Sequence, residues 1–80
     1  MLTTGNQLKA ARALAGMDQG TLAERAGVNI NTISSMEKKG AGLLTSGLDK
    51  IRAVMMALEA EGIEFLNHGQ PGVRLKASSD

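Results

Sequence analysis

The chain has 80 residues, a formal net charge of +1, no cysteine and one aromatic residue, Phe65. A chain of this length forms one small domain with a marginal core, and without cysteine it has neither disulfides nor thiolate zinc sites to reinforce that core. A single aromatic residue also argues against single-stranded nucleic acid as the ligand, because such binding uses stacked aromatic platforms.

Membrane insertion and catalysis find little support in the sequence. No run approaches the roughly 18 apolar residues of a membrane span, and the first residues lack the apolar centre of a signal peptide. His68 is the only histidine, and no cysteine or cluster of carboxylates accompanies it. We therefore expect a cytoplasmic protein that is not an enzyme and has no catalytic residue, metal site, cofactor, small-molecule ligand or membrane partner.

The charges are unevenly distributed along the chain. Residues 1–40 hold five basic and three acidic side chains, whereas residues 41–80 hold four basic and five acidic ones. Because affinity for DNA comes largely from neutralising phosphates, we expect any electrostatic footprint for DNA in the first half.

Three short helices are expected in that first half, over residues 5–15, 19–26 and 30–39. Apolar residues recur there at helical spacing. Asp18 and Asn29 are favourable caps for the second and third helices, and glycines follow the predicted ends of the helices. Two helices joined by a short turn that contains glycine, with another helix in front, form a helix-turn-helix pattern.

The second half predicts a long helix and then two strands. Ser46 and Asp49 fit a capping box that opens a helix ending near residue 61, with Leu48 facing inward. Period-two alternation then predicts strands over residues 63–66 and 73–77. A two-stranded hairpin is marginal alone, so these strands must pack on the fourth helix, on another protomer, or on both.

The segment "QLKAARALAGMDQGTLAERAGVNINTISSMEKKG", residues 7–40, resembles the Cro/CI-type (XRE) family of helix-turn-helix transcriptional regulators. With the later "ALEAEGIEF" and "PGVRL", the chain is similar to small single-domain bacterial or mobile-element members. The resemblance implies a mainly α, lambda-repressor-like fold of four to five helices with a short C-terminal β-hairpin or strand pair. It places the DNA-binding domain at 1–62 with its helix-turn-helix at 18–38, a dimerisation extension at 63–77 and a disordered tail at 78–80.

The resemblance also implies which residues touch double-stranded DNA, because in this family the third helix enters the major groove. The base contacts it implies are Asn29, Ile30, Asn31 and Ser35. The phosphate contacts it implies are Gln19, Thr32, Ser34, Lys38 and Lys39. Asn31 suits adenine, since an amide pairs bidentately with its N6 and N7. Alternatives remain for several of these residues: ordinary solvated capping for Gln19, an apolar start of the helix for Ile30, a phosphate contact for Ser35, and a solvated helix end for the two lysines.

Two further expectations concern contacts within and between protomers. The family pattern pairs Arg12 with Glu37, which would fix the first helix on the third. A homodimer on a pseudopalindromic operator is expected, with an interface of Met55, Leu58, Ile63, Phe65, Val73 and Leu75. The strands could instead only complete the monomer core. The alternative function is a protein-binding regulator, such as an antiactivator or antitoxin-like protein, that does not bind DNA specifically.

Overall fold

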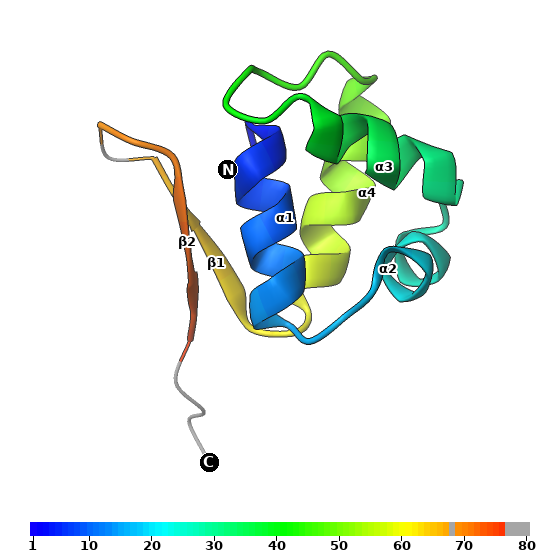
Figure 1. Cartoon of the computed structure of the whole chain (residues 1–80). Helices are drawn as coiled ribbons and strands as arrows, with labels where there is room; N and C mark the ends of the chain where they lie inside the picture. Colours follow the sequence, from blue (N-terminus) through cyan, green and yellow to red (C-terminus); the bar gives the residue numbers. More distant parts are fainter. Residues whose placement is uncertain (68, 77–80) are drawn as a thin grey trace.

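The structure is a computed structural model that describes residues 1–67 and 69–76. These residues form four helices and one antiparallel hairpin, which is the predicted mainly α fold with a C-terminal hairpin (Figure 1). The elements are α1 (Gly5–Leu14), α2 (Gln19–Ala26), α3 (Ile30–Lys38), α4 (Leu48–Glu59), β1 (Ile63–Leu66) and β2 (Gly72–Leu75). None of the described helices is long and apolar enough to cross a membrane.

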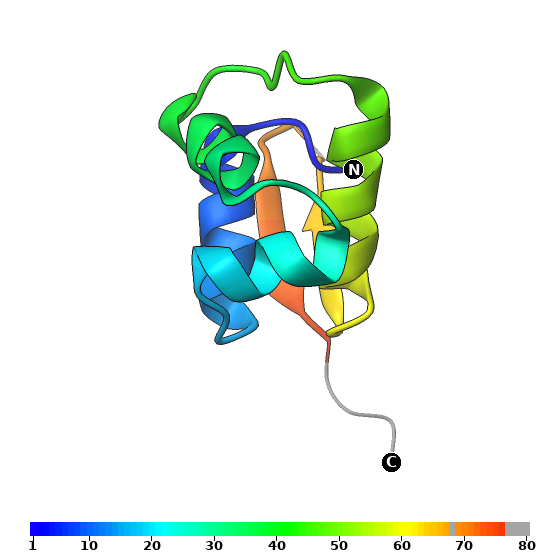
Figure 2. The ribbon, with the colours of Figure 1, turned by 90° about the vertical axis from the view of Figure 1, so that its right-hand side faces the viewer.

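The elements are arranged in three layers. Helices α1 and α4 form the middle layer, the hairpin lies on one side of it, and α2 and α3 lie on the other (Figures 1 and 2). Apolar side chains from every layer meet in one core, whose fully buried members include Leu2, Leu8, Leu22, Ile33, Met36, Val54, Leu58 and Ile63. The surface of α3 that faces away from this core is therefore on the opposite side of the molecule from the hairpin.

Local capping sets the positions of α2 and α3 as the sequence predicts. The Asp18 carboxylate accepts a hydrogen bond of 2.7 Å from the N–H of Thr21, and the Asn29 side-chain oxygen accepts one of 2.7 Å from the N–H of Asn31. Between the two helices, Gly27 adopts a left-handed conformation with φ of +71°. A residue without a Cβ adopts this conformation at little cost, so α2 ends there and the chain turns into α3.

Helix α1 begins against the end of α3. A Cβ atom on Gly5 would lie 2.4 Å from the carbonyl oxygen of Met36, so only glycine allows the two backbones to approach this closely. The N–H of Asn6 then donates to the carbonyl oxygen of Gly40 at 2.8 Å. These contacts fix the C-terminal end of α3 relative to the middle layer.

The start of α4 differs from the prediction. Gly47 is the N-cap and makes no side-chain hydrogen bond, so the capping box of Ser46 and Asp49 is wrong. Leu48 is 59% exposed rather than buried. The helix covers the core instead with Ile51, Val54 and Leu58, which lie on one face at helical spacing. The helix also ends at Glu59, two residues earlier than predicted.

The hairpin packs mainly on α1, not on α4. In its register Ile63 lies opposite Leu75 and Phe65 opposite Val73, so these four side chains share one face of the sheet, which is turned toward the core. The second strand begins at Gly72 and ends at Leu75, not at 73 and 77. Residues 77–80, including the predicted tail, and His68 lie outside the described residues.

This packing corrects the predicted dimer interface. Leu58 and Ile63 are 0% and 2% exposed within the single chain, so they belong to the monomer core and are not accessible to a partner. Met55, Phe65 and Val73 are half-buried and also pack against the core, whereas Leu75 is 48% exposed. The apolar face of the hairpin therefore packs on the monomer core.

Gln7 ties the hairpin to α1. Its side-chain oxygen accepts hydrogen bonds from the N–H groups of Thr3 and Thr4, and its side-chain nitrogen lies within hydrogen-bond distance of the carbonyl oxygens of Leu66 and Gly72. The residue is only 3% exposed. Because unsatisfied buried amides are costly, Gln7 holds the loop end of the hairpin, where Leu66 pairs with Gly72, at one position on the helix.

Candidate nucleic-acid interface

Helix α3 presents a polar face to solvent. Ile33 and Met36 are buried on one side, while Asn31, Ser35 and Lys38 are exposed on the other. Their spacing of four and three residues places these exposed side chains on one face of the helix. Small side chains along this face would let the helix backbone come close to a flat or grooved ligand.

The N-terminal end of α3 adds two more of the predicted base-contacting residues. Asn29 is exposed, but its side-chain oxygen is engaged with the N–H of Asn31, so its amide nitrogen is the group left for a base. Ile30 is 47% exposed and suits a thymine methyl group. Thr32 and Ser34 are half-buried and lie on opposite sides of the exposed face. Lys39 is exposed at the C-terminal end of α3.

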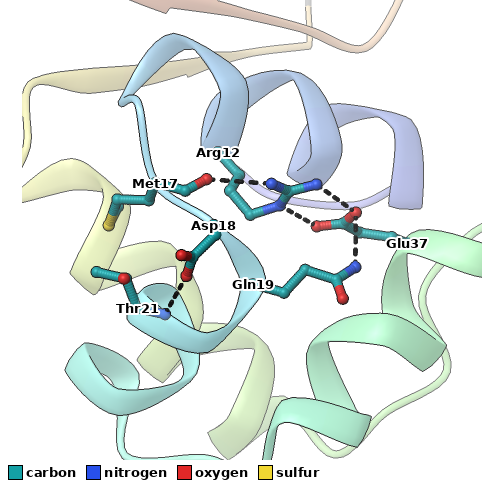
Figure 3. A network of polar contacts seen from close by, with 6 residues as sticks. All are labelled: Arg12, Met17, Asp18, Gln19, Thr21 and Glu37. Atoms are coloured by element: carbon teal, nitrogen blue, oxygen red, sulfur yellow. Dashed lines mark hydrogen bonds and ion pairs between the residues drawn. The ribbon is translucent and has the colours of Figure 1, made fainter.

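The N-terminus of α2 flanks the Ile30 and Ser34 side of this face. Gln19, the first residue of α2, donates from its side-chain nitrogen to a Glu37 carboxylate oxygen at 3.2 Å. This contact fixes the direction of the Gln19 side chain next to α3 (Figure 3). A helix N-terminus attracts phosphate through its free N–H groups, so this position is compatible with the predicted phosphate contact.

Arg12 and Glu37 form the expected ion pair beneath Gln19. The guanidinium donates two hydrogen bonds to the carboxylate, of 2.7 and 3.0 Å, and a third of 3.1 Å to the carbonyl oxygen of Met17 (Figure 3). The side chains are 19% and 7% exposed. The hydrogen bond to Glu37 is the main reason that the pKa of Arg12 is raised above its ordinary value. The pair joins α1, the turn before α2, and α3.

Asp18 places a negative charge at the same helix N-terminus. Its hydrogen bond from the backbone N–H of Thr21 is the main reason that its pKa is lowered below the ordinary value of 3.8, so it is ionised at neutral pH. Its carboxylate already interacts with the positive end of the α2 dipole. A phosphate that approached the N-terminus of α2 would therefore meet this charge.

The N-terminus of α4 flanks the other side of α3. A hollow of about 340 Å³ is lined by Asn31, Thr32, Ser35, Ser46, Gly47 and Lys50. Lys50 is exposed, and the N-cap of α4 carries no side-chain hydrogen bond. The first N–H groups of α4 and the Lys50 ammonium therefore lie close to the recognition face that the sequence predicted.

Sequence reasoning missed Lys50. The charge count assigned this residue to the acidic half of the chain, and the footprint for DNA was expected only in residues 1–40. The fold brings it to α3 because the connector after Gly40 returns the chain alongside that helix. One signal could have indicated Lys50: it is a basic residue near the start of the helix that follows the candidate recognition helix.

Nothing in the described residues resembles a metal centre, since no group of three or more His, Cys, Asp or Glu side chains gathers in residues 1–67 and 69–76.

The comparisons with known proteins do not assign the chain to a family. No protein-family model matches it, and no curated protein is significantly similar to it in sequence. The candidate site therefore rests on geometry and on the residue pattern.

Proposed function

We propose that the protein is a transcriptional regulator that binds double-stranded DNA as a homodimer, with α3 in the major groove. The observation that carries this proposal is the exposed polar face of α3, flanked on both sides by helix N-termini. Major-groove recognition needs a protruding helix with hydrogen-bonding side chains, and neighbouring helix N-termini supply backbone N–H groups to phosphates.

Each part of the interface has a separate task in this proposal. Asn31 and Ser35 reach base edges, and Asn31 favours adenine. Gln19 and Lys38 bind the phosphates on the α2 side and at the end of α3. Lys50 adds a phosphate contact on the α4 side, beyond the set that the sequence predicted. Thus phosphate contacts surround the residues that read bases.

The face of α3 has no arginine, so the bidentate contact to guanine is absent from it. With so few strong contacts, one domain binds weakly, and a second copy is needed for selective binding. Two-fold dimers of such domains read half-sites about 34 Å apart. The longest dimension of the chain is 35 Å, so two copies arranged along that direction would match this spacing.

Selection of bound duplexes from random DNA tests the proposal. We expect an enriched motif with two inverted half-sites one helical turn apart, and an affinity for it that falls steeply as salt rises. Lys38→Ala should weaken binding to all duplexes about equally. Failure to enrich any sequence at low salt would remove the proposal and favour the protein-binding regulator instead.

A further inference from the structure

A hollow of about 350 Å³ lies between α1, β2 and the connector that follows α3. Its outer walls are Asn6 and Ala10 of α1, Ala41 of the connector, and Pro71 and Val73 at β2. Pockets that bind small molecules measure roughly 300–1,000 Å³, so the hollow is large enough for a small ligand. None of its lining residues belongs to the proposed DNA interface. A ligand in it would therefore leave the contacts proposed for DNA free.

Hydrogen bonds hold the inner part of this hollow in shape. Thr4 and Gln7 line it and are 4% and 3% exposed. The Thr4 hydroxyl oxygen accepts a hydrogen bond of 3.1 Å from the N–H of Gln7, and the Gln7 side-chain nitrogen donates to the carbonyl oxygen of Gly72 at 3.1 Å. These contacts fix the spacing between α1 and β2. The hollow is therefore preformed, and a ligand would not have to order its walls.

The chemistry of the lining favours an uncharged ligand. Ala10, Ala41, Pro71 and Val73 provide apolar surface, and none of the described lining residues carries a charge. The hollow of about 340 Å³ beside α3 differs, because Lys50 lines it. An ionised group placed against apolar walls without a counter-charge loses hydration that nothing replaces, which costs free energy. The lining therefore suits a neutral molecule and not a phosphate or a carboxylate.

Both walls also offer polar groups to a ligand. The Asn6 side chain is exposed and forms no hydrogen bond with any residue in 1–67 and 69–76. On the other wall, the N–H of Lys76 donates to the carbonyl oxygen of Gly62 at 2.8 Å, so these two residues are a hydrogen-bonded pair of the hairpin. Such pairs alternate with non-hydrogen-bonded pairs along an antiparallel ladder, so Val73, opposite Phe65, directs its N–H and C=O away from β1.

We propose that this hollow binds a small, neutral aromatic amide, with its ring against the apolar walls and its amide paired with the side chain of Asn6. An amide has both a donor and an acceptor, as the Asn6 side chain does, so two hydrogen bonds can form between them. Because Ala10 and Ala41 are small, they leave space for a ring. Sequence reasoning expected no small-molecule ligand, since the walls come from three segments of the chain that only the fold brings together.

NMR titration of the isotope-labelled protein with benzamide tests the site. We expect saturable shifts of the Asn6, Ala10, Ala41 and Val73 backbone amides, with a Kd on the order of 1 mM for so small a ligand. Benzoate and benzamidinium have nearly the same shape but carry a charge, and each should bind about tenfold more weakly or worse. Absence of saturable shifts at these four amides, or equal binding by the charged analogues, would overturn the proposal.

Filling the hollow provides the matched pair of variants. Ala10→Leu places a larger side chain in the hollow, whereas Ala13→Leu places the same side chain on the exposed surface of α1, outside the lining. Leucine is a good helix former, so both variants should keep the fold, which circular dichroism checks. We expect Ala10→Leu to weaken benzamide binding by about tenfold or more and Ala13→Leu to leave it unchanged. Equal affinities in the two variants would place the ligand elsewhere.

The role of Asn6 has its own test. Asn6→Ala removes the exposed amide but keeps the backbone hydrogen bond to Gly40, so the fold should be retained. We expect benzamide to bind about fivefold more weakly to this variant, the effect of one lost hydrogen-bonding partner. Unchanged affinity would contradict the pairing of the two amides.

The site is independent of the proposed function, because the two share no residue. Selection of duplexes from random DNA is therefore measured separately from the benzamide titration. A protein that binds benzamide and enriches no duplex would remove the proposed function and leave this site standing. Specific DNA binding without saturable benzamide shifts would remove the site alone.

Discussion

The N-termini of α2 and α4 flank the same exposed face of α3, but they are built differently. The α2 terminus is capped by the Asp18 carboxylate and anchored through Gln19 to the Arg12–Glu37 pair. The α4 terminus begins at Gly47 without a side-chain cap and has both Asp49 and Lys50 in its first turn. In the first arrangement the carboxylate of Asp18 is used as a cap, whereas in the second the first N–H groups have no side-chain cap and a carboxylate and an ammonium group share the first turn.

This difference assigns separate roles to the two sides. In the proposed interface, the anchored α2 side would orient α3 and place Gln19 toward a phosphate, while Lys50 on the α4 side would attract a second phosphate.

Removal of the anchor should have the largest effect. Arg12→Ala leaves the nearly buried Glu37 carboxylate without its partner, and we expect the free energy of unfolding to fall by about 3 kcal/mol in urea denaturation. The control is Arg25→Ala, which breaks the exposed Arg25–Glu61 pair and should cost less than about 1 kcal/mol. Equal losses in the two variants would show that the Arg12 pair is no anchor.

The face between the two sides should determine sequence preference. Asn31→Ala removes an exposed amide, and we expect discrimination at one base position in each half-site to fall by about 1–3 kcal/mol. Selection from random DNA with the variant and the original protein measures this change. Affinity for unrelated duplexes should be unaltered, and a motif identical to that of the original protein would exclude a base contact by Asn31.

The α4 side should contribute one phosphate contact. Lys50→Ala should weaken binding to every duplex by about fivefold to tenfold at 0.1 M salt, and the slope of log affinity against log salt should fall by about one. Lys76→Ala, at the end of the hairpin in the opposite layer, is the control and should change neither quantity. If both variants behave alike, Lys50 lies outside the interface.

The α2 side should bind DNA better without its carboxylate. Asp18→Asn keeps an oxygen for the N–H of Thr21 but removes the charge, so we expect affinity for DNA to rise by about twofold to fivefold. Glu59→Gln, near the far end of α4, should leave affinity unchanged. Weaker binding by Asp18→Asn would mean that the carboxylate supports the interface.

The same substitution gives the smallest effect, on the acid sensitivity of folding. The folded-state pKa of Asp18 is lowered, so its stabilising contribution is present above the ordinary value of 3.8 and is lost as pH falls through the folded-state pKa. As the pH falls below 3.8, the free energy of unfolding, measured by urea denaturation, should therefore decrease more in the original protein than in Asp18→Asn. Parallel stability curves would contradict this.

Local patterns predicted much of the first half of the chain. The caps Asp18 and Asn29 act through hydrogen bonds within three residues, and Gly27 ends α2 through its own conformation. Such features depend on nearby residues alone, so the sequence reveals them. The boundaries of α2 and the inward face of α3 follow from the same short-range rules.

Features that depend on tertiary packing were missed or wrong. The capping box at Ser46 fits its pattern, but the connector delivers the chain so that Gly47 becomes the cap and Leu48 stays exposed. The hairpin strands alternate as predicted, yet nothing local indicates that they pack on α1 through Gln7. Lys50 likewise reaches α3 only through the path of the connector.

The most direct test of the central claim is an NMR titration of the isotope-labelled protein with a duplex enriched from random DNA. We expect backbone amide shifts to change along α3 and at two separate flanking segments, residues 19–20 and 46–50, with the hairpin's solvent-facing residues unaffected. Shifts confined to the hairpin, or changes in α3 without either flank, would contradict the claim that two helix N-termini frame the recognition helix.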